Sequence, residues 1–100
     1  QVGWHPSAGW QTDDFTGQVR QALENTMAVL AEAGARGEHI ARMTWYVTDK
    51  QAYLANLREI GAIYAKTIGR NYPAMTLVEV TALVEDRALV EIETTAVVPD

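Results

Sequence analysis

Residues 72–80, with the sequence YPAMTLVEV, are the stretch that best indicates the fold class of this chain. They also raise the question of why a carboxylate lies in an otherwise apolar strand. Pro73 cannot continue a preceding helix, so a new element begins here. Alternate positions then place Met75, Leu77 and Glu79 on one face of a strand. The pattern predicts a strand over residues 74–84, with a carboxylate in a row that is otherwise largely apolar.

Two amphipathic helices are predicted upstream of this strand. Asp13 and Asp14 can cap the first, whose apolar residues recur at steps of three and four, and Gly34 ends it. Asp49 can cap the second, which ends at Gly69. Between the helices, residues 40–48 alternate between two faces and are rich in β-branched and aromatic residues, which predicts a strand with Trp45 in the core.

A last strand is predicted over residues 88–98, joined to the strand at 74–84 by the short charged loop Glu85-Asp86-Arg87. A hairpin around this loop sets Glu79 directly opposite Glu93 and Met75 opposite Val97. The row that contains Met75 would then face away from the helices, and the smaller row of Ala74, Thr76 and Val78, with Val90 and Ile92 of the last strand, would pack beneath them. We therefore expect an α+β domain with two helices on one face of a sheet and with other subunits covering the second face.

The composition of the chain limits its expected domain number, cellular compartment and partners. The chain has 100 residues, which predicts one domain over residues 1–100, and no Cys, which favours a reducing compartment such as the cytoplasm. The net charge is −5 and the basic residues are scattered, so nucleic acid is not an expected partner. No apolar run is long enough to span a membrane. The chain starts at Gln1 with turn-like sequence, so we expect further residues before it.

Few residues have the spacing of a known kind of site. His5 and His39 are isolated, so no metal site is predicted. There is no Gly-rich phosphate loop and no Gly-x-Ser-x-Gly motif, which disfavours nucleotide binding and serine hydrolysis. Glu79, Glu91 and Glu93 share one face in the predicted hairpin, and such a group can supply a general acid or base. They are equally compatible with solvated glutamates on an exposed strand.

Four stretches carry a resemblance to a known family. Residues 18–35 (QVRQALENTMAVLAEAGA), 44–49 (TWYVTD), 72–83 (YPAMTLVEVTAL) and 89–97 (LVEIETTAV) resemble the RidA family, also called YjgF or endoribonuclease L-PSP. The resemblance implies a chorismate mutase-like fold, with N-terminal strands that would precede Gln1, and a homotrimer whose sheets line a central barrel. It also implies a small-molecule ligand in each intersubunit cleft and hydrolysis of reactive enamines and imines to 2-keto acids and ammonia, without a cofactor.

The resemblance assigns roles to residues of this chain. The first Glu of the Glu-Ile-Glu motif, here Glu91, is associated with the water that attacks the imine carbon. An Arg that binds the substrate carboxylate is replaced by Met75, which cannot form that contact. We therefore expect Glu91 to be catalytic and an apolar cleft floor of Met75 and Leu77 to bind substrate. Further expected members of the site are Thr76 for substrate binding, and Glu79 and Glu93 in support.

The loss of this Arg leaves the function open. One hypothesis is a deaminase with altered specificity, whose substrate lacks a carboxylate or has its anion held by Arg42, Arg58 or Arg70. The alternative is a non-catalytic trimeric protein that binds or senses a small molecule on the same scaffold. Ribonuclease activity follows only from the older family name, and the acidic chain argues against it.

Overall fold

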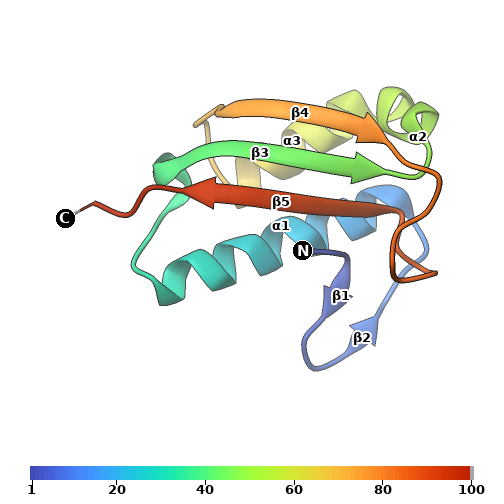
Figure 1. The fold of residues 1–100 in the computed structure, drawn as a ribbon, viewed down its shortest axis with the longest axis horizontal. Coiled ribbons are helices and arrows are strands. Elements are labelled where there is room, and N and C mark those ends of the chain that lie inside the picture. The colour runs from blue at the N-terminus through green and yellow to red at the C-terminus, as the bar shows by residue number, and fades with distance from the viewer. Residues whose placement is uncertain (100) are drawn as a thin grey trace.

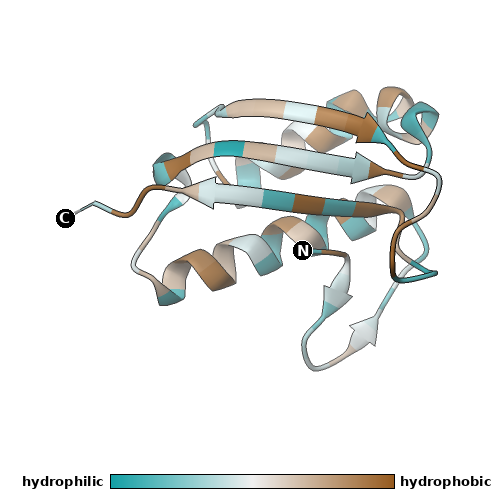
Figure 2. Cartoon of the chain, in the orientation of Figure 1, coloured by the Kyte–Doolittle hydropathy of each residue, from teal (hydrophilic) through white to brown (hydrophobic). Residues whose placement is uncertain are grey.

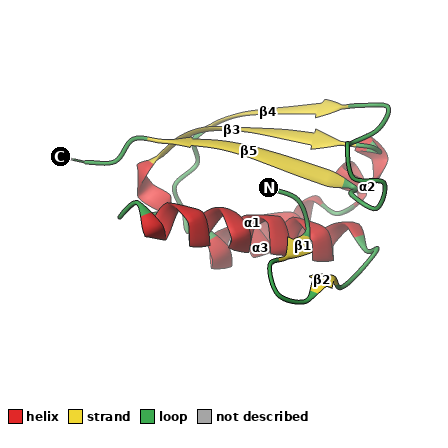
Figure 3. Ribbon diagram, turned by 60° about the horizontal axis from the view of Figure 1, so that its bottom comes forward, coloured by secondary structure: helices red, strands yellow, loops and turns green. Residues whose placement is uncertain are grey.

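The computed structural model describes residues 1–99 and consists of a three-stranded sheet backed by helices (Figure 1). In chain order the elements are β1 (Trp4–His5), β2 (Gly9–Trp10), α1 (Phe15–Glu32), the 3-10 helix η1 (Gly37–His39), β3 (Ile40–Val47), α2 (Lys50–Ala55), α3 (Leu57–Thr67), β4 (Ala74–Glu79) and β5 (Val90–Ala96). The sheet order is β4-β3-β5, and β1 pairs with β2 separately. The two main helices, α1 and α3, lie on one face of the sheet, which confirms the predicted α+β arrangement (Figure 3).

Helix α1 begins and ends where the sequence predicts. Asp14 is its N-cap, and the carboxylate Oδ2 accepts a hydrogen bond from the backbone N–H of Gly17 at 3.1 Å. Gly34, which follows the C-cap residue Ala33, has a φ of +74°, a conformation that glycine adopts without steric cost. Capping chemistry is local in sequence, so both boundaries were predictable.

The second predicted helix is broken into α2 and α3. Asp49 caps α2 as expected, since its Oδ1 accepts from Gln51 N at 2.9 Å. At Asn56 the backbone leaves the helical conformation, and Asn56 Nδ2 donates to Ala52 O at 2.7 Å. An Asn side chain that bonds a nearby carbonyl competes with the helical backbone, which explains the break. Gly69, with a φ of +110°, follows α3 as predicted.

The predicted hairpin between the last two strands is wrong. Strand β3 lies between β4 and β5, and pairs with β4 in parallel and with β5 antiparallel. Both strands are also shorter than expected, and residues 80–89 form an irregular connection. This connection crosses the end of β3, because Val80 N donates to Val47 O at 2.8 Å and Thr48 N donates to Leu89 O at 3.2 Å. An alternating pattern identifies a strand but does not name its partner.

The strand register assigns each row of side chains to a face of the sheet. Trp45 of β3 is buried and pairs with Leu77 on one side and Ile92 on the other, so these three residues face the helices together. The row of Met75, Leu77 and Glu79 therefore faces the helix side, which corrects the prediction that it faces away. For β5 the prediction is confirmed: Val90 and Ile92 are buried, and the hydropathy of the strand alternates (Figure 2).

The core lies between the helices and the inner face of the sheet. Trp45 is 1% exposed, as the sequence predicts, and packs edge-on against the ring of Tyr53. The buried cluster comprises Phe15, Val19, Ala22, Leu23, Ile40, Met43, Trp45, Val47, Ile60, Ile63, Tyr64, Ile68, Val90 and Ile92. Burial of this apolar surface is the main contribution to the stability of the fold.

A fully buried amide on α1 holds the connection before β5 in place. Gln18 is 0% exposed, and its Nε2 donates to Thr12 O at 3.1 Å and to Arg87 O at 3.0 Å. Its Oε1 accepts from Leu89 N at 2.8 Å. These bonds fix residues 87–89 against α1 and so set the position at which β5 begins.

We predict that Gln18→Met lowers the free energy of unfolding by about 3 kcal/mol, because it retains the side-chain length but leaves buried backbone groups without partners. Chemical denaturation monitored by circular dichroism measures the change. Gln11→Met, at an exposed position before α1, is the control and should change stability by less than about 0.5 kcal/mol. Equal stability of the two variants would show that the Gln18 amide contributes little.

Candidate active site

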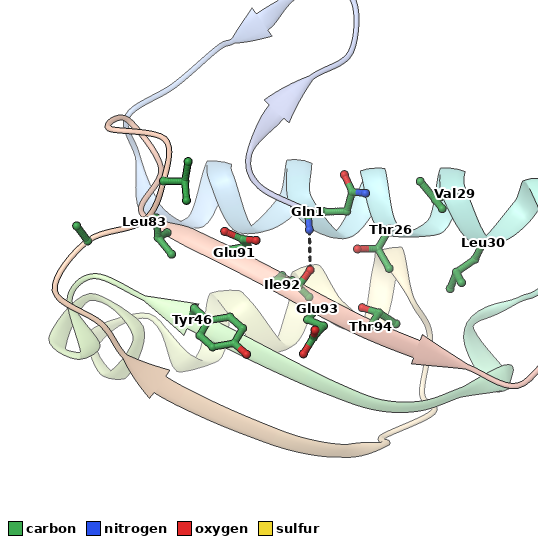
Figure 4. A pocket seen from close by; sticks show the side chains of 12 residues that line it. Gln1, Thr26, Val29, Leu30, Tyr46, Leu83, Glu91, Ile92, Glu93 and Thr94 are labelled. Carbon is green, nitrogen blue, oxygen red and sulfur yellow. Dashed lines mark hydrogen bonds between the residues drawn. The ribbon is translucent and has the colours of Figure 1, made fainter.

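A cleft of about 520 Å³ lies beside β5 and contains Glu91, the expected catalytic residue (Figure 4). We call it the β5 cleft. It is formed by α1, β5, part of β3, the first residue of the chain and the connection before β5. Its lining residues are Gln1, Thr26, Val29, Leu30, Tyr46, Ala82, Leu83, Val84, Glu91, Ile92, Glu93 and Thr94.

The alternation of β5 positions Glu91 in this cleft. Val90 and Ile92 on either side are buried against the helices, so Glu91 is turned to the opposite face of the sheet, where it is half-buried. Glu93 follows on the same face and is more exposed. The first residues of the chain run along this edge: Gln1 N donates to Ile92 O at 2.7 Å, and Ile92 N donates to Gln1 O at 2.8 Å.

Tyr46 also lies in the cleft, although the sequence suggested at most a role in stacking on a ligand and no place among the expected site residues. It is the register partner of Glu91 on the neighbouring strand, and it is half-buried. Figure 4 shows its ring on the same stretch of sheet as Glu91 and Glu93. The alternation of residues 40–48 had already separated Tyr46 from Trp45, but only the register between β3 and β5 places it beside Glu91. The cleft thus combines two carboxylates with a phenol.

Glu93, expected to support Glu91, lies in the β5 cleft, but the expected substrate-binding residues do not. Met75 is on the helix-facing side of β4, where it lines a second, smaller cavity, and Leu77 packs against the core. Thr76 is exposed on the other face of the sheet and pairs with Thr44. The expectation that Met75 and Leu77 form one cleft with Glu91 therefore does not hold within a single chain.

Glu79 has a structural contact instead of the predicted position opposite Glu93. Its register partner is Val47, and its Oε1 accepts a hydrogen bond from the backbone N–H of Lys50 at 2.9 Å. This bond satisfies one of the free N–H groups at the start of α2. Because β3 separates Glu79 from Glu93 and the two side chains face opposite sides of the sheet, Glu79 does not act on Glu93 directly.

Within residues 1–99, no group of three or more His, Asp or Glu side chains is placed to hold a metal ion. None of the helices described is long and apolar enough to cross a membrane.

The sequence and the fold together define the class of protein. The chain matches the Endoribonuclease L-PSP family over residues 1–98 and belongs to this family, as the resemblance implied. A RutC family protein of Haemophilus influenzae is 34% identical over 97 residues, which cover 97% of this chain and 74% of the relative.

Two further relatives have more specific names. A 2-iminobutanoate/2-iminopropanoate deaminase of Salmonella typhimurium is 32% identical over 100 residues, which cover 97% of this chain and 74% of that protein. The crystal structure of TdcF from E. coli with bound serine superposes with a TM-score of 0.87 at 30% identity, and covers 99% of this chain and 76% of that one.

Proposed function

We propose that this protein is a hydrolytic deaminase of reactive enamines and imines, with a substrate specificity altered by Met75. The observation that supports it most directly is Glu91, half-buried in a cleft of about 520 Å³ that has room for a small ligand and a water molecule. Similarity to proteins named 2-iminobutanoate/2-iminopropanoate deaminase and putative reactive intermediate deaminase TdcF agrees with this reaction class. Catalysis without a cofactor and a cytoplasmic location remain predictions.

The proposed reaction adds one water molecule across a carbon–nitrogen double bond. The Glu91 carboxylate accepts a proton as the water oxygen bonds to the imine carbon, and the nitrogen is protonated in the same step or the next. The hydroxyl proton of the resulting carbinolamine then passes to the nitrogen, ammonia leaves with the carbon–nitrogen electron pair, and a lone pair on the oxygen completes the carbonyl product. Water is the only co-reactant, so no oxidant or reductant is needed.

The experiment that tests this function measures carbonyl product and ammonia from two sets of imines generated in situ. Amine oxidases release imines without a carboxylate, and amino acid oxidases release imines that carry one. Acceleration of either set above the uncatalysed rate supports a deaminase. If no imine is accelerated, the deaminase proposal fails and the non-catalytic binding protein, which the loss of the family Arg at Met75 favours, becomes the better hypothesis.

A complete site of this kind requires more than one chain. Glu91 and Met75 face opposite sides of the sheet on strands separated by β3, so one chain cannot present both to one small ligand. We propose that the subunits of a homotrimer bring Glu91 of one chain to Met75 of the next, with the ligand in the intersubunit cleft. Val84, which lines the β5 cleft and is 96% exposed, is an apolar residue that a neighbouring subunit would cover.

We therefore predict a mass in solution close to three times the chain mass of 11.0 kDa. Sedimentation equilibrium at several protein concentrations measures it. Val84→Asp should shift the equilibrium toward monomer, because it places a charge in the expected interface. Val29→Asp, on an exposed position of α1 that also lines the β5 cleft, tests whether any added carboxylate near the cleft has the same effect. A monomeric mass for the unmodified chain at all concentrations would contradict the trimer.

A further inference from the structure

A second cavity lies on the helix side of the sheet, beside the free edge of β4. We call it the β4 cavity. It has a volume of about 220 Å³ and sits between strands β3 and β4, the helices α2 and α3, and the segment that leads into β4. Its lining residues are Met43, Trp45, Tyr53, Leu57, Ile60, Gly61, Tyr64, Tyr72, Pro73 and Met75.

The lining of the β4 cavity is neutral and rich in aromatic rings. Trp45 meets Tyr53 edge-on, with ring centroids 6.1 Å apart, and Tyr64 stacks on Tyr72 with centroids 5.8 Å apart. Burial raises the pKa of the Tyr64 phenol above its ordinary value, and the neighbouring Tyr72 adds to the shift, which makes ionisation of this already neutral group still less favourable. An anion in this cavity would lose its hydration without gaining a cation as partner.

The cavity wall is ordered by contacts within the chain. The Tyr64 hydroxyl donates to Asn71 O at 2.7 Å, and Asn71 Nδ2 donates to Gly37 O at 2.9 Å. These bonds fix the segment before β4 against α3 and η1. The wall is therefore largely preformed, which lowers the entropic cost of binding a ligand.

Trp45 leaves one polar group unsatisfied at this site. The residue is 1% exposed, and its indole Nε1 has no hydrogen-bond partner among residues 1–99. A buried donor without a partner is destabilising, and a small movement that lets a ligand oxygen reach it would recover that cost. Trp45 therefore combines a ring that lines the β4 cavity with a donor that has no partner among the described residues.

Gly61 contributes to the open space of the cavity. It lies inside α3, and a Cβ built at this position would meet no atom within 4 Å. Neither the backbone conformation nor close packing therefore requires a glycine here, although alanine would favour the helix by about 1 kcal/mol. A Cβ at this position therefore meets open space, and Gly61 itself lines the cavity.

We propose that the β4 cavity binds a neutral, single-ring aromatic group, and that Met75 at its mouth determines this specificity. The volume is below the range of roughly 300–1,000 Å³ typical of drug-sized ligands, which suits one ring. The aromatic walls offer edge-to-face contacts, and the absence of charged residues from the lining disfavours carboxylates. In the deaminase, on which this step rests, the group is the side chain of the imine substrate.

The test uses p-cresol as the neutral probe and 4-methylbenzoate as its matched anion, with the indole N–H resonances of the protein as the readout. The resonance of Trp45 is assigned with Trp45→Phe, and Trp4 and Trp10, which lie in β1 and β2, are internal controls. We expect p-cresol to shift the Trp45 resonance saturably and 4-methylbenzoate to bind at least about tenfold more weakly. Equal shifts of all three indoles, or none, would overturn the proposal.

Variants locate the binding. Gly61→Leu should weaken p-cresol binding by about tenfold or more, whereas Gly61→Ala should change it by less than about threefold. If Gly61→Leu does not fold, Met75→Trp serves the same purpose, because Met75 is 43% exposed and the larger ring narrows the mouth of the cavity from outside. Binding of p-cresol that neither substitution weakens would place the probe elsewhere.

Measurements of imine hydrolysis distinguish a failure of the β4 cavity proposal from a failure of the deaminase proposal. Probe binding without hydrolysis of any imine would leave the β4 cavity as a binding site and remove the deaminase. Hydrolysis of an imine derived from 4-methylbenzylamine that Gly61→Leu does not slow would leave the deaminase and overturn the role of the cavity.

Discussion

Glu91→Gln should lower kcat/KM for imine hydrolysis by about 10²–10⁴-fold, the usual contribution of a general base. The substitution keeps the size and hydrogen-bonding capacity of the side chain but removes the group that accepts the proton from water. Stability should change little, because Glu91 is only half-buried and its carboxylate forms no hydrogen bond or ion pair with another residue of the 1–99 segment. Product release from imines generated in situ gives the rate.

Two matched variants show whether the effect belongs to Glu91. Glu59→Gln removes a carboxylate from an exposed position on α3 and should leave the rate unchanged. Glu93→Gln removes the neighbouring carboxylate of the β5 cleft, and we expect a smaller loss, less than about tenfold, for a residue that only supports Glu91. A wild-type rate for Glu91→Gln would exclude it as the base, and a larger loss for Glu93→Gln would transfer the role to Glu93.

Elements whose signals are local were predictable from the sequence. Asp14 and Gly34 mark the ends of α1 through a side-chain cap and a left-handed residue, and both signals lie within a few positions of the helix. Strand β3 was predictable because its two faces differ sharply, with Trp45 buried and its neighbours partly exposed. The break at Asn56 was missed because one helix-compatible residue leaves no gap in the apolar pattern.

The pairing of β4 and β5 was not predictable because it depends on contacts distant in sequence. Gln18 lies about 70 residues from Arg87 and Leu89, which it holds against α1, and no local pattern reveals that contact. Both rows of β4 are also largely apolar, so alternation alone did not show which row faces the helices. In the assumed hairpin, the faces of β4 followed from those of β5. This assignment wrongly placed Met75 on the same face of the sheet as Glu91.

This error matters for the site more than for the fold. Glu91 was assigned to the correct face of the sheet, because Val90 and Ile92 are distinctly apolar beside it. Met75 was assigned to the wrong face, and with it the single cleft that the two residues would share. The corrected register is the basis for proposing a site built from two chains, and it draws attention to the β4 cavity, which the sequence did not indicate.

Met75→Arg should raise kcat/KM for imines that carry a carboxylate by about a hundredfold. A guanidinium can form a bidentate, charge-assisted pair with a carboxylate, and such a pair in a desolvated cleft contributes about 3 kcal/mol. Met75 is 43% exposed at the mouth of its cavity, so the new charge can remain hydrated until substrate binds and should not destabilise the fold. Imines released by amino acid oxidases are the substrates for this measurement.

The side chain at position 75 can be varied to separate charge from shape. Met75→Leu should give no gain, and Met75→Lys a smaller one, because an ammonium is a point charge without the forked geometry of guanidinium. Adding Glu91→Gln to Met75→Arg should abolish the gain, since tighter carboxylate binding cannot replace the base.

The same Met75→Arg substitution should weaken binding of p-cresol, because this neutral probe gains no ion pair from the new charge. If Met75→Arg is folded and trimeric but gains nothing on carboxylate-bearing imines, residue 75 does not contact the substrate, and the proposal that Met75 alters the specificity is wrong.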